Sequence, residues 1–518
     1  MIKNLKLSQS SIVILFYGFL LFLRLLWVYA QPLEKLIAFV PDDAFYYLQI
    51  SKNSARNLGW TFDGLEPTTG FHLLYALLLE CIFKAFPEIS FHSIFLLVGI
   101  LGSILLLCAF ALTVISISKL FGNKYVWVAL IVFTPLNVIF QSTAMMESSL
   151  VLFFASVVLY LLISENLMVE ERYSSLTFFP WTALVIGFFG SLARSDFGLL
   201  PGSLLVGLFL LKFFGLNLKI RGLLATLIGS CLGLVVLFIH NFSISGSIFQ
   251  SSAKMKSYWN SLFGNNFRGP LNMFLDLILP FWSEVTFLPK IVLMLSLISA
   301  LAAILIKAKR GKVILSLSLG MLFPATSYII FYSFNSQSFQ IWYVAIFASI
   351  AALLLAGLLS ALNLPTWMLM SLVIILVPLN LKQSYDARAP YALQADLYEA
   401  AQFVKNSPSN NLYGSWNAGI LGYFSDNRVV NIDGLANDKI LDYVKKGDLF
   451  GYLSQRKITH LIDFRAMYAS PDLQKRGGFT QTQVDNCLIL DRRFAGQERD
   501  GWGYIEINRV QHGSRCKS

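Results

Sequence analysis

The chain has 518 residues, of which 56% are hydrophobic and 13% are charged, and its mean hydropathy is +0.64. Soluble domains contain about 45–50% apolar and about 25% charged residues, so the composition excludes an ordinary soluble protein. The net charge is +11, and the basic residues gather in short segments between apolar runs. This pattern is typical of a membrane protein with basic cytoplasmic loops, and it argues against nucleic acid as a partner.

The first apolar run follows the basic segment MIKNLKLSQS and reads SIVILFYGFLLFLRLLWVYA. It is longer than the apolar core of a signal peptide and has no small-residue cleavage site. We therefore interpret it as the first transmembrane helix, with Lys3 and Lys6 and hence the N-terminus in the cytoplasm. Apolar runs of spanning length recur up to about residue 381. The expected transmembrane helices, eleven in all, are residues 11–30, 91–118, 125–141, 148–164, 177–193, 197–211, 222–243, 288–306, 313–333, 341–360 and 366–381.

With these eleven helices, the basic loops all fall on the cytoplasmic side. They are residues 119–124, the stretch around Arg172, residues 212–221 and the cluster at 307–312. The apolar piece 71–86 is short and contains His72 and Glu80, and counting it as a span would reverse the charge pattern of later loops. We expect it within a structured first loop on the outer face, residues 31–90.

After residue 381 the composition becomes mixed and polar. The stretch ALQADLYEAAQFVKN is typical of a helix, and RVVNI and THLIDF are typical of strands. We predict two domains: a transmembrane module at 1–381 and an extracytoplasmic α/β domain at 382–518. Cys487 and Cys516 both lie in the second domain, where an oxidising compartment permits a disulfide that the sequence leaves open. The five cysteines include no CxxC motif, so no metal knuckle or redox motif is indicated.

Two adjacent acids, Asp42 and Asp43, stand in the motif PDDAFYYLQI where the chain leaves the first helix. A carboxylate near a surface of low dielectric constant can take a proton from a hydroxyl, and an adjacent like charge raises its pKa toward a useful value. The alternative is that these acids cap the following helix, which stabilises a protein by about 1 kcal/mol. Capping requires only one of the two.

Further ionisable residues fall at predicted helix ends. Glu147, in QSTAMMESSL, lies on the same side of the membrane as Asp43, so the two carboxylates can converge on one site; the alternative is a favourable interaction with the next helix N-terminus. Arg194 and Asp196 interrupt apolar helices in SLARSDFG. Ionisable residues at membrane depth indicate function or pairing, and a mutual ion pair is the structural alternative.

The external loop at 243–287 carries cations, with Lys254 and Lys256 in SISGSIFQSSAKMKSYWN and Arg268 beyond. These cations suit a phosphate that emerges from the membrane, although contact with anionic headgroups explains them almost as well. Trp342 and Tyr343 begin a helix at the outer interface, where such aromatic residues commonly act as anchors.

In this order, the motifs DDAFYYLQISKN, TFDG, TTGFH, MMESSL, LARSD, GSIFQSSAK and WY resemble bacterial multi-pass glycosyltransferases of the GT-C fold class. The resemblance covers nearly the entire chain. The stretch YGSWNAGILGYFSDNRVVNIDGLAND looks like the tail of one bacterial branch that is distantly similar to protein O-mannosyltransferases and lipid A aminoarabinose transferases. The chain departs from the protein mannosyltransferases in having Asp-Asp for Asp-Glu, and it has no WWDxG block, so oligosaccharide transfer to asparagine is not expected.

The resemblance implies an α-helical polytopic protein of the bacterial cytoplasmic membrane that takes sugar from a polyprenyl phosphate on the outer face. It implies a first-loop aspartate as general base, matched best by Asp43 and second by Asp42, and inversion at the anomeric carbon. Glu147 then positions the base or the acceptor. The implied donor-phosphate ligands are Arg194, Lys254, Lys256 and Arg268, and the implied substrate contacts are Tyr46, Tyr47, His72, Asp196, Trp342 and Tyr343.

The expected partners are the bilayer, the lipid-linked donor and a glycan, lipid or protein acceptor. No cofactor is expected to be required. Asp43 and Glu147 could share a divalent metal ion through their carboxylate oxygens. We favour a metal-independent reaction, because lysine and arginine can supply the positive charge. The rival interpretation is a transporter or flippase in which the acids line a substrate path. No internal repeat with matching broken helices supports a carrier. A third interpretation is a non-catalytic scaffold whose outer domain binds a partner.

Overall fold

The protein divides into two compact units in the computed structural model, which describes residues 8–167, 179–212, 218–278, 311–336, 340–386, 391, 393–426, 428–494, 502–513 and 516. Unit 1 comprises Met1–Tyr29, Phe95–Val236 and Asn265–Arg388. Unit 2 comprises Ala30–Ile94, Leu237–Gly264 and Ala389–Ser518. The first loop therefore folds with the C-terminal segment, whereas the sequence analysis grouped it with the transmembrane helices.

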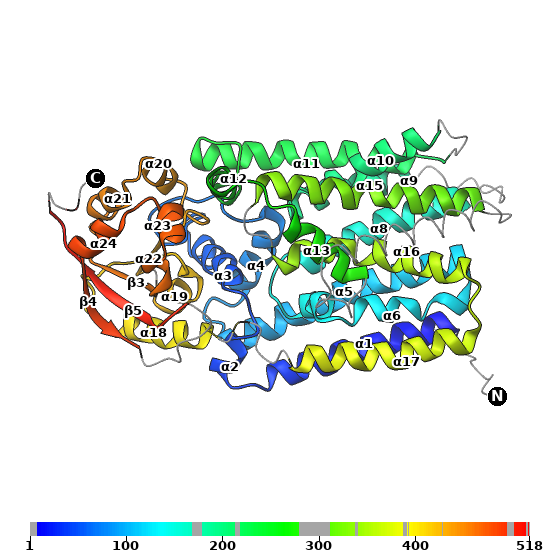
Figure 1. The fold of residues 1–518 in the computed structure, drawn as a ribbon, viewed down its shortest axis with the longest axis horizontal. Helices are drawn as coiled ribbons and strands as arrows, with labels where there is room; N and C mark the ends of the chain where they lie inside the picture. Colours follow the sequence, from blue (N-terminus) through cyan, green and yellow to red (C-terminus); the bar gives the residue numbers. More distant parts are fainter. Residues whose placement is uncertain are drawn as a thin grey trace. The chain divides into compact units, whose positions relative to one another are not determined.

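Unit 1 is built from long apolar helices that run alongside one another (Figure 1). Among the described residues, six helices are long and apolar enough to cross a membrane, or seven if one bent pair forms a single span. The chain is thus a multi-pass membrane protein. The predicted helix at 288–306 lies outside the described residues. The helices of this unit are α1 (Gln9–Tyr29), α5 (Phe91–Phe121), η1 (Asn123–Tyr125), α6 (Val128–Phe133), α7 (Leu136–Ile139), η2 (Phe140–Ser142), α8 (Ser148–Leu167), α9 (Phe179–Ala193), α10 (Leu199–Lys212), α11 (Arg221–Ser245), α13 (Arg268–Ile278), α15 (Gly311–Asn335), η5 (Ile341–Tyr343), η6 (Ala345–Phe347), α16 (Ala348–Ala361) and α17 (Thr366–Asp386).

The helix predicted at 125–141 is present as a bent pair, because the chain turns by 82° between Asn123–Phe133 and Leu136–Ser142. Pro135 is the cause, since it has no N–H to donate to the carbonyl of Ile131 and disfavours helix in the preceding residue. An apolar environment requires the released carbonyl groups to find other donors. The Asn380 side-chain amide donates to the Ile131 carbonyl oxygen at 3.1 Å, and the Tyr17 hydroxyl donates to that of Phe133 at 3.0 Å.

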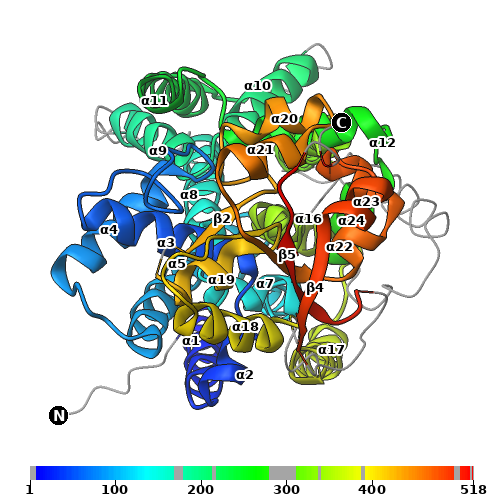
Figure 2. The same ribbon diagram turned by 90° about the vertical axis from the view of Figure 1, so that its left-hand side faces the viewer.

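Unit 2 is an α/β body with a five-stranded sheet in the order β2-β1-β3-β5-β4. The strands β2, β1 and β3 are parallel, and β5 is antiparallel to both β3 and β4. Strands β4 and β5 lie side by side in Figure 2. The elements of this unit are α2 (Leu33–Ile37), α3 (Asp42–Ala55), α4 (Leu73–Ala85), α12 (Ser251–Phe263), α18 (Gln394–Asn406), β1 (Tyr413–Ser415), α19 (Ala418–Phe424), β2 (Val429–Asn431), α20 (Ile440–Lys445), α21 (Leu449–Gln455), β3 (His460–Phe464), α22 (Ala466–Ala469), α23 (Pro471–Gly477), α24 (Gln481–Cys487), β4 (Leu488–Arg493) and β5 (Ile505–Val510).

The first-loop helices form part of the core of unit 2. Helix α3 packs against α19 and α4, and α19 also packs against α18, β1 and β2. Helix α4 lies within the apolar piece 71–86, which we expected outside the membrane, and it has only 13 residues. A disulfide joins Cys487 at the end of α24 to Cys516.

Ion pairs also join the first loop to the C-terminal segment. The Arg456 guanidinium contacts the carboxylates of Glu66 at 2.6 Å and Asp63 at 3.3 Å. The Lys439 ammonium lies 2.6 Å from Glu66. Since these partners are more than 370 residues apart in the chain, unit 2 is assembled from segments that the sequence separates widely.

Candidate functional site

Asp42 caps a helix, but not its own. Pro41 is the N-cap of α3 and makes no side-chain capping bond. The two Asp42 carboxylate oxygens instead accept hydrogen bonds from the N–H groups of Gly419 at 3.0 Å and Ile420 at 2.8 Å, in the first turn of α19. These N–H groups have no partner within their own helix, so Asp42 satisfies them from a distant part of the chain. The structure thus gives Asp42 the role of a cap for α19.

Tyr46 lies one turn later on α3 and completes this attachment. Its hydroxyl accepts from the Ala418 N–H and donates to the Trp416 carbonyl oxygen, both at 3.1 Å. The Asn431 side-chain amide lies at the same distance from the hydroxyl. Since Trp416 and Ala418 follow β1 and Asn431 ends β2, the first turn of α3 lies at the carboxyl ends of two parallel strands, where α/β proteins commonly bind ligands.

A fully buried carboxylate, that of Asp463 on β3, supports the same loop. It accepts hydrogen bonds from the Ser415 hydroxyl and from the N–H groups of Trp416 and Asn417, at 2.8 to 2.9 Å. The side chain of Asn417 also donates to it at 2.7 Å. With donors on both oxygens, this side chain is a structural support for the β1–α19 loop.

The charge of Asp43 acts on two ionisable groups from the C-terminal segment, Asp433 and Arg476. Asp433 is in the loop after β2, and Arg476 is on α23. Burial raises the pKa of Asp433 to about 7; the positive charge of Arg476 opposes this shift, and the negative charge of Asp43 adds to it. Burial lowers the pKa of Arg476, while the charges of Asp433 and Asp43 act in the opposite direction.

The raised pKa values predict a pH-dependent stability of unit 2. Burial raises the pKa of Asp42, like that of Asp433, to about 7 from 3.8, although its two N–H bonds oppose the shift. The folded state then binds more protons than the unfolded state between about pH 4 and pH 7, so stability should fall as the pH rises through this window. Each group contributes at most about 1.4 kcal/mol per pH unit. Thermal unfolding between pH 4.5 and 8 should show this decline, with a shallower slope for Asp433→Asn. The exposed Asp472→Asn is the control and should keep the wild-type slope. A wild-type slope in Asp433→Asn would contradict the raised pKa of Asp433.

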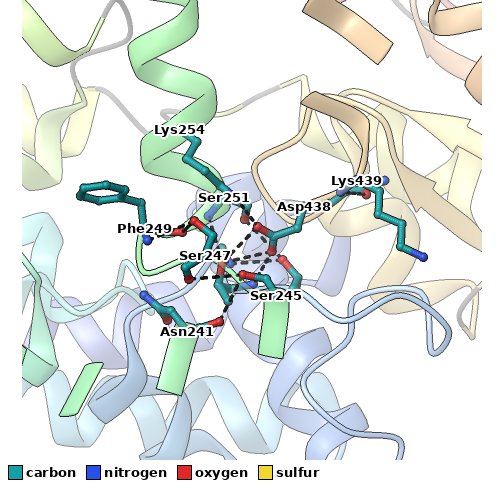
Figure 3. A network of polar contacts seen from close by, with 12 residues as sticks. Asn241, Ser245, Ser247, Phe249, Ser251, Lys254, Asp438 and Lys439 are labelled. Carbon is teal, nitrogen blue, oxygen red and sulfur yellow. Dashed lines mark hydrogen bonds and ion pairs between the residues drawn. The ribbon is translucent and has the colours of Figure 1, made fainter. Parts of the chain in front are cut away.

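Lys254 is part of a polar network that fastens α12 to the first loop (Figure 3). The Lys254 ammonium lies 2.8 Å from the Asp438 carboxylate. This carboxylate also accepts hydrogen bonds from the Thr69 N–H, at 2.9 Å, and from the Thr69 hydroxyl. The Ser251 N–H donates to the Thr69 hydroxyl at 3.0 Å, and the Ser251 hydroxyl donates to the Leu435 carbonyl oxygen at 2.9 Å. We call this set the α12 clasp. The cation predicted to bind phosphate therefore has a carboxylate partner in this structure.

A double-mutant cycle tests the clasp. Lys254→Ala and Asp438→Ala should each destabilise the protein, and their effects should be coupled by about 1–2 kcal/mol, because the pair is largely buried and is hydrogen-bonded. Thermal unfolding of the two single variants and the double variant measures this coupling. Additive effects would show that the pair contributes nothing. The control is the exposed pair of Lys405 and Asp426, whose charged groups lie 4.0 Å apart. Lys405→Ala and Asp426→Ala should show no comparable coupling.

Three other predicted residues lie in unit 2. Tyr47 is buried, with its ring centroid 6.4 Å from that of His72 and 5.3 Å from that of Tyr75. His72 occupies the N-cap position of α4. Lys256 is half-buried on α12. The structure thus gathers Asp42, Asp43, Tyr46, Tyr47, His72, Lys254 and Lys256 into one compact unit.

In unit 1, Arg194 and Asp196 form a bidentate ion pair. The guanidinium donates to the two carboxylate oxygens at 2.7 and 2.9 Å, and the arginine side chain is only 2% exposed. The Tyr332 hydroxyl donates to the same carboxylate, and the Tyr343 ring stacks on that of Tyr332 with centroids 4.9 Å apart. Trp342, also buried, precedes Tyr343 in η5. The pairing considered as the structural alternative is therefore present.

Glu147 also belongs to unit 1. It is buried, immediately precedes α8, and lies two residues after Met145, which has a φ of 53°. Most of α8 is buried inside the protein, unlike the peripheral α17. Arg268, by contrast, is exposed at the first position of α13. Among the residues described, no three His, Cys, Asp or Glu side chains are arranged to hold a metal ion.

Sequence reasoning missed Asp433 and Arg476. Asp433 stands in RVVNIDG directly after a predicted strand, and polar residues in that position are frequent ligands in α/β proteins. That signal was available. Nothing in the sequence around Arg476, in DLQKRGG, distinguishes it from a solvated lysine- and arginine-rich helix end.

Comparisons with known proteins support the fold. ArnT from Cupriavidus metallidurans, solved with undecaprenyl phosphate, is 12% identical and matches with a TM-score of 0.54 over 96% of this chain and 99% of its own. The oligosaccharyltransferase of Archaeoglobus fulgidus, solved with a tethered acceptor peptide, is 13% identical and matches with a TM-score of 0.51 over 93% of this chain and 74% of its own. The chain therefore has the GT-C fold, the fold of multi-pass glycosyltransferases that use lipid-linked donors.

The sequence comparisons are less specific. Residues 384–506 match the model of a domain of unknown function, DUF8728. A comparison with curated protein sequences finds no match. The matched segment includes Asp433, Arg476, the strands β1 to β4 and the first two residues of β5.

Proposed function

We propose that the protein is an inverting glycosyltransferase that moves a sugar from a polyprenyl phosphate to an acceptor hydroxyl on the extracytoplasmic face of the membrane. The GT-C fold, extending over almost the full length of both this chain and ArnT, supports the glycosyltransferase activity. ArnT was solved with undecaprenyl phosphate, which supports a donor of the same chemical class here. The observation that carries the proposal is the capping of α19 by Asp42 at the start of α3; the adjacent Asp43, whose charge acts on Asp433 and Arg476, is then the proposed base.

In the proposed reaction, Asp43 accepts the proton of the acceptor hydroxyl. The acceptor oxygen forms a bond to the anomeric carbon while the bond from that carbon to the phosphate oxygen breaks, and the polyprenyl phosphate leaves with the electron pair. Because one displacement takes place on the face opposite the leaving group, the anomeric configuration inverts. A lipid phosphate is already a competent leaving group, so the protein mainly supplies a base, cations and orientation.

The other residues keep the roles that the sequence resemblance implies. Glu147 orients the base or the acceptor, and Arg194, Lys254, Lys256 and Arg268 balance the departing phosphate. Two of these cations, Arg194 and Lys254, already pair with carboxylates. A donor phosphate that binds either of them takes the place of Asp196 or Asp438, or shares the cation with it. No metal is part of this proposal.

Reconstituted protein tests the proposal directly. Undecaprenyl phosphate linked to a radiolabelled sugar, offered in vesicles together with membranes from cells that lack the protein, should transfer label to an acceptor and release undecaprenyl phosphate. A panel of donors differing in the sugar identifies the one used, and NMR of the product identifies its anomeric configuration. Failure to use any member of a broad panel would contradict the proposed donor class, and retention of configuration would contradict the single displacement. Net movement of intact lipid-linked sugar between leaflets, without transfer, would support the flippase instead.

A further inference from the structure

An arginine lies on the inner face of the first transmembrane helix. Arg24 belongs to α1, little more than one turn before this helix ends at Tyr29. It is in line with the buried residues Tyr17 and Val28, and only 8% of it is exposed. Ionisable residues at membrane depth are costly to bury and indicate a function or a partner. The charge of Arg24 therefore requires an explanation.

The described part of the chain supplies no partner for this charge. The Nε atom of Arg24 is buried without a hydrogen-bond partner, and no ion pair within the described residues includes this arginine. Arg194, which is also buried in unit 1, shows the contrast, since it forms a bidentate ion pair with Asp196. Removing one partner from a buried pair is strongly destabilising. Arg24 is therefore a buried cation that an anion from outside the chain can balance.

Two neighbouring helices approach α1 at the level of Arg24. A Cβ atom on Gly99 of α5 would lie 2.6 Å from a methyl carbon of Leu25, the residue after Arg24. The helices α1 and α17 run alongside each other (Figure 1), and the ring centroids of Trp27 and Tyr385 lie 5.3 Å apart. Trp27 is within one turn of Arg24. The arginine thus lies where α1 meets both α5 and α17.

These two helices carry buried polar atoms without partners at the same level. They are the hydroxyl oxygens of Ser103, one turn after Gly99 on α5, and of Ser384, next to Tyr385 on α17, and the side-chain carbonyl oxygen of Asn380, one turn before Ser384. The amide nitrogen of Asn380 already donates to the α6–α7 bend, which fixes the orientation of its oxygen. Buried polar atoms are rarely left unpaired, so such a group indicates a bound molecule.

We propose that Arg24 binds the phosphate group of a lipid, and that Ser103, Asn380 and Ser384 complete the polar surroundings of that phosphate. We call these four residues the Arg24 site. A phosphate balances the charge and has several oxygens that accept from a guanidinium and from hydroxyls. A protonated phosphate oxygen or a headgroup hydroxyl can in turn donate to the Asn380 oxygen.

The depth and the surroundings of the Arg24 site favour a lipid as the source of the phosphate. Trp27 and Tyr385 are residues of the kind that concentrates at the membrane–water interface, where lipid phosphates lie. Only 33% of the apolar stretch of α1 and 22% of that of α17 are buried inside the protein, so both helices border the lipid. A phospholipid and a polyprenyl phosphate share this chemistry. The inference does not depend on the proposed function, because it concerns lipid binding and no step of transfer.

The experiment measures lipid binding to the purified full-length protein by native mass spectrometry and by the shift in unfolding temperature. The probes are undecaprenyl phosphate, phosphatidylglycerol and undecaprenol, which lacks the phosphate. Loss of a charge-assisted hydrogen bond corresponds to about tenfold or more in affinity, so Arg24→Gln should weaken phosphate-dependent binding by that factor. Arg24→Lys should lie between this variant and wild type. The matched control is Arg221→Gln at the exposed first position of α11, which should bind like wild type.

The pattern across the probes identifies the source of the phosphate. Weaker binding of undecaprenyl phosphate alone supports a polyprenyl phosphate site, and weaker binding of phosphatidylglycerol supports a phospholipid headgroup site. Wild-type affinity of Arg24→Gln for both lipids would overturn the inference, and so would an equal loss for undecaprenol, because the phosphate would then not be what Arg24 binds. If Arg24→Gln does not fold, Arg24→Lys and Ser384→Ala decide the question: weaker phosphate-dependent binding supports the inference, and wild-type binding in both overturns it.

Discussion

Asp43→Asn should reduce the rate of sugar transfer by about 10²- to 10⁴-fold, which is the contribution that a positioned general base commonly makes. Asparagine has nearly the same shape as aspartate but cannot accept the proton of the acceptor hydroxyl. We expect the thermal unfolding temperature and the donor KM to remain close to those of wild type. Transfer of radiolabelled sugar from undecaprenyl phosphate under single-turnover conditions measures the effect on the chemical step.

Asp42→Asn is the matched control, because it makes the same chemical change one residue away. The two Asp42 carboxylate oxygens accept hydrogen bonds from the N–H groups of Gly419 and Ile420, whereas asparagine has one acceptor oxygen, so one N–H loses its partner at a cost of about 1–3 kcal/mol. This variant should therefore lower the unfolding temperature while keeping substantial transfer activity. The opposite pattern, with activity lost in Asp42→Asn and kept in Asp43→Asn, would exchange the roles of the two acids.

Gly70→Ala should destabilise unit 2 strongly. A Cβ atom at this position would lie 1.8 Å from the Leu435 carbonyl oxygen and 2.8 Å from the Ser251 hydroxyl, so one of two backbone segments must move. Overpacking of a well-packed site costs about 1–3 kcal/mol, and a clash with backbone lies at the upper end of that range or above it. The same movement separates Thr69 from the other members of the α12 clasp. The unfolding temperature of the purified protein in detergent should fall by several degrees.

Gly513→Ala provides the comparison, because nothing lies within 4 Å of a Cβ atom at that position. This change should leave the unfolding temperature unaltered, so any effect common to glycine replacement in general is subtracted. An unfolding temperature for Gly70→Ala equal to that of Gly513→Ala would show that the first loop and the loop after β2 do not approach each other as described.

Much of unit 1 follows from apolar periodicity and helix-end signals. The predictions at 91–118, 148–164 and 366–381 begin at the same residues as α5, α8 and α17, although each observed helix continues a few residues further. The extra turns contain polar residues such as Lys119 and Glu165, which a hydropathy criterion excludes but a buried or interfacial position tolerates. The break at Pro135 was predictable from proline chemistry. The polar residues that satisfy the released carbonyl groups, Tyr17 and Asn380, were not, because they come from helices distant in the chain.

The candidate site could also be predicted only in part, because its contacts join segments that are distant in the chain. The acids Asp42 and Asp43 stand out in the sequence, but identical neighbours carry no signal that tells a cap from a base. The distinction comes from Gly419 and Ile420, which lie more than 370 residues away and meet Asp42 only in the folded unit. Likewise, Lys254 is an ordinary exposed cation on sequence grounds, and its pairing with Asp438 depends on how α12 packs. Long-range partners of this kind are set by tertiary packing and leave no local pattern.

The most direct test of the account is an experimental structure of the protein in a lipid nanodisc with a non-transferable phosphonate analogue of a polyprenyl-phosphate sugar. We predict that the sugar binds at the first turn of α3, with its anomeric carbon facing the Asp43 carboxylate across the space that an acceptor hydroxyl would occupy. Asp42 should remain bonded to α19 in that complex. A sugar bound away from α3, with Asp43 turned from the anomeric carbon, would contradict the account.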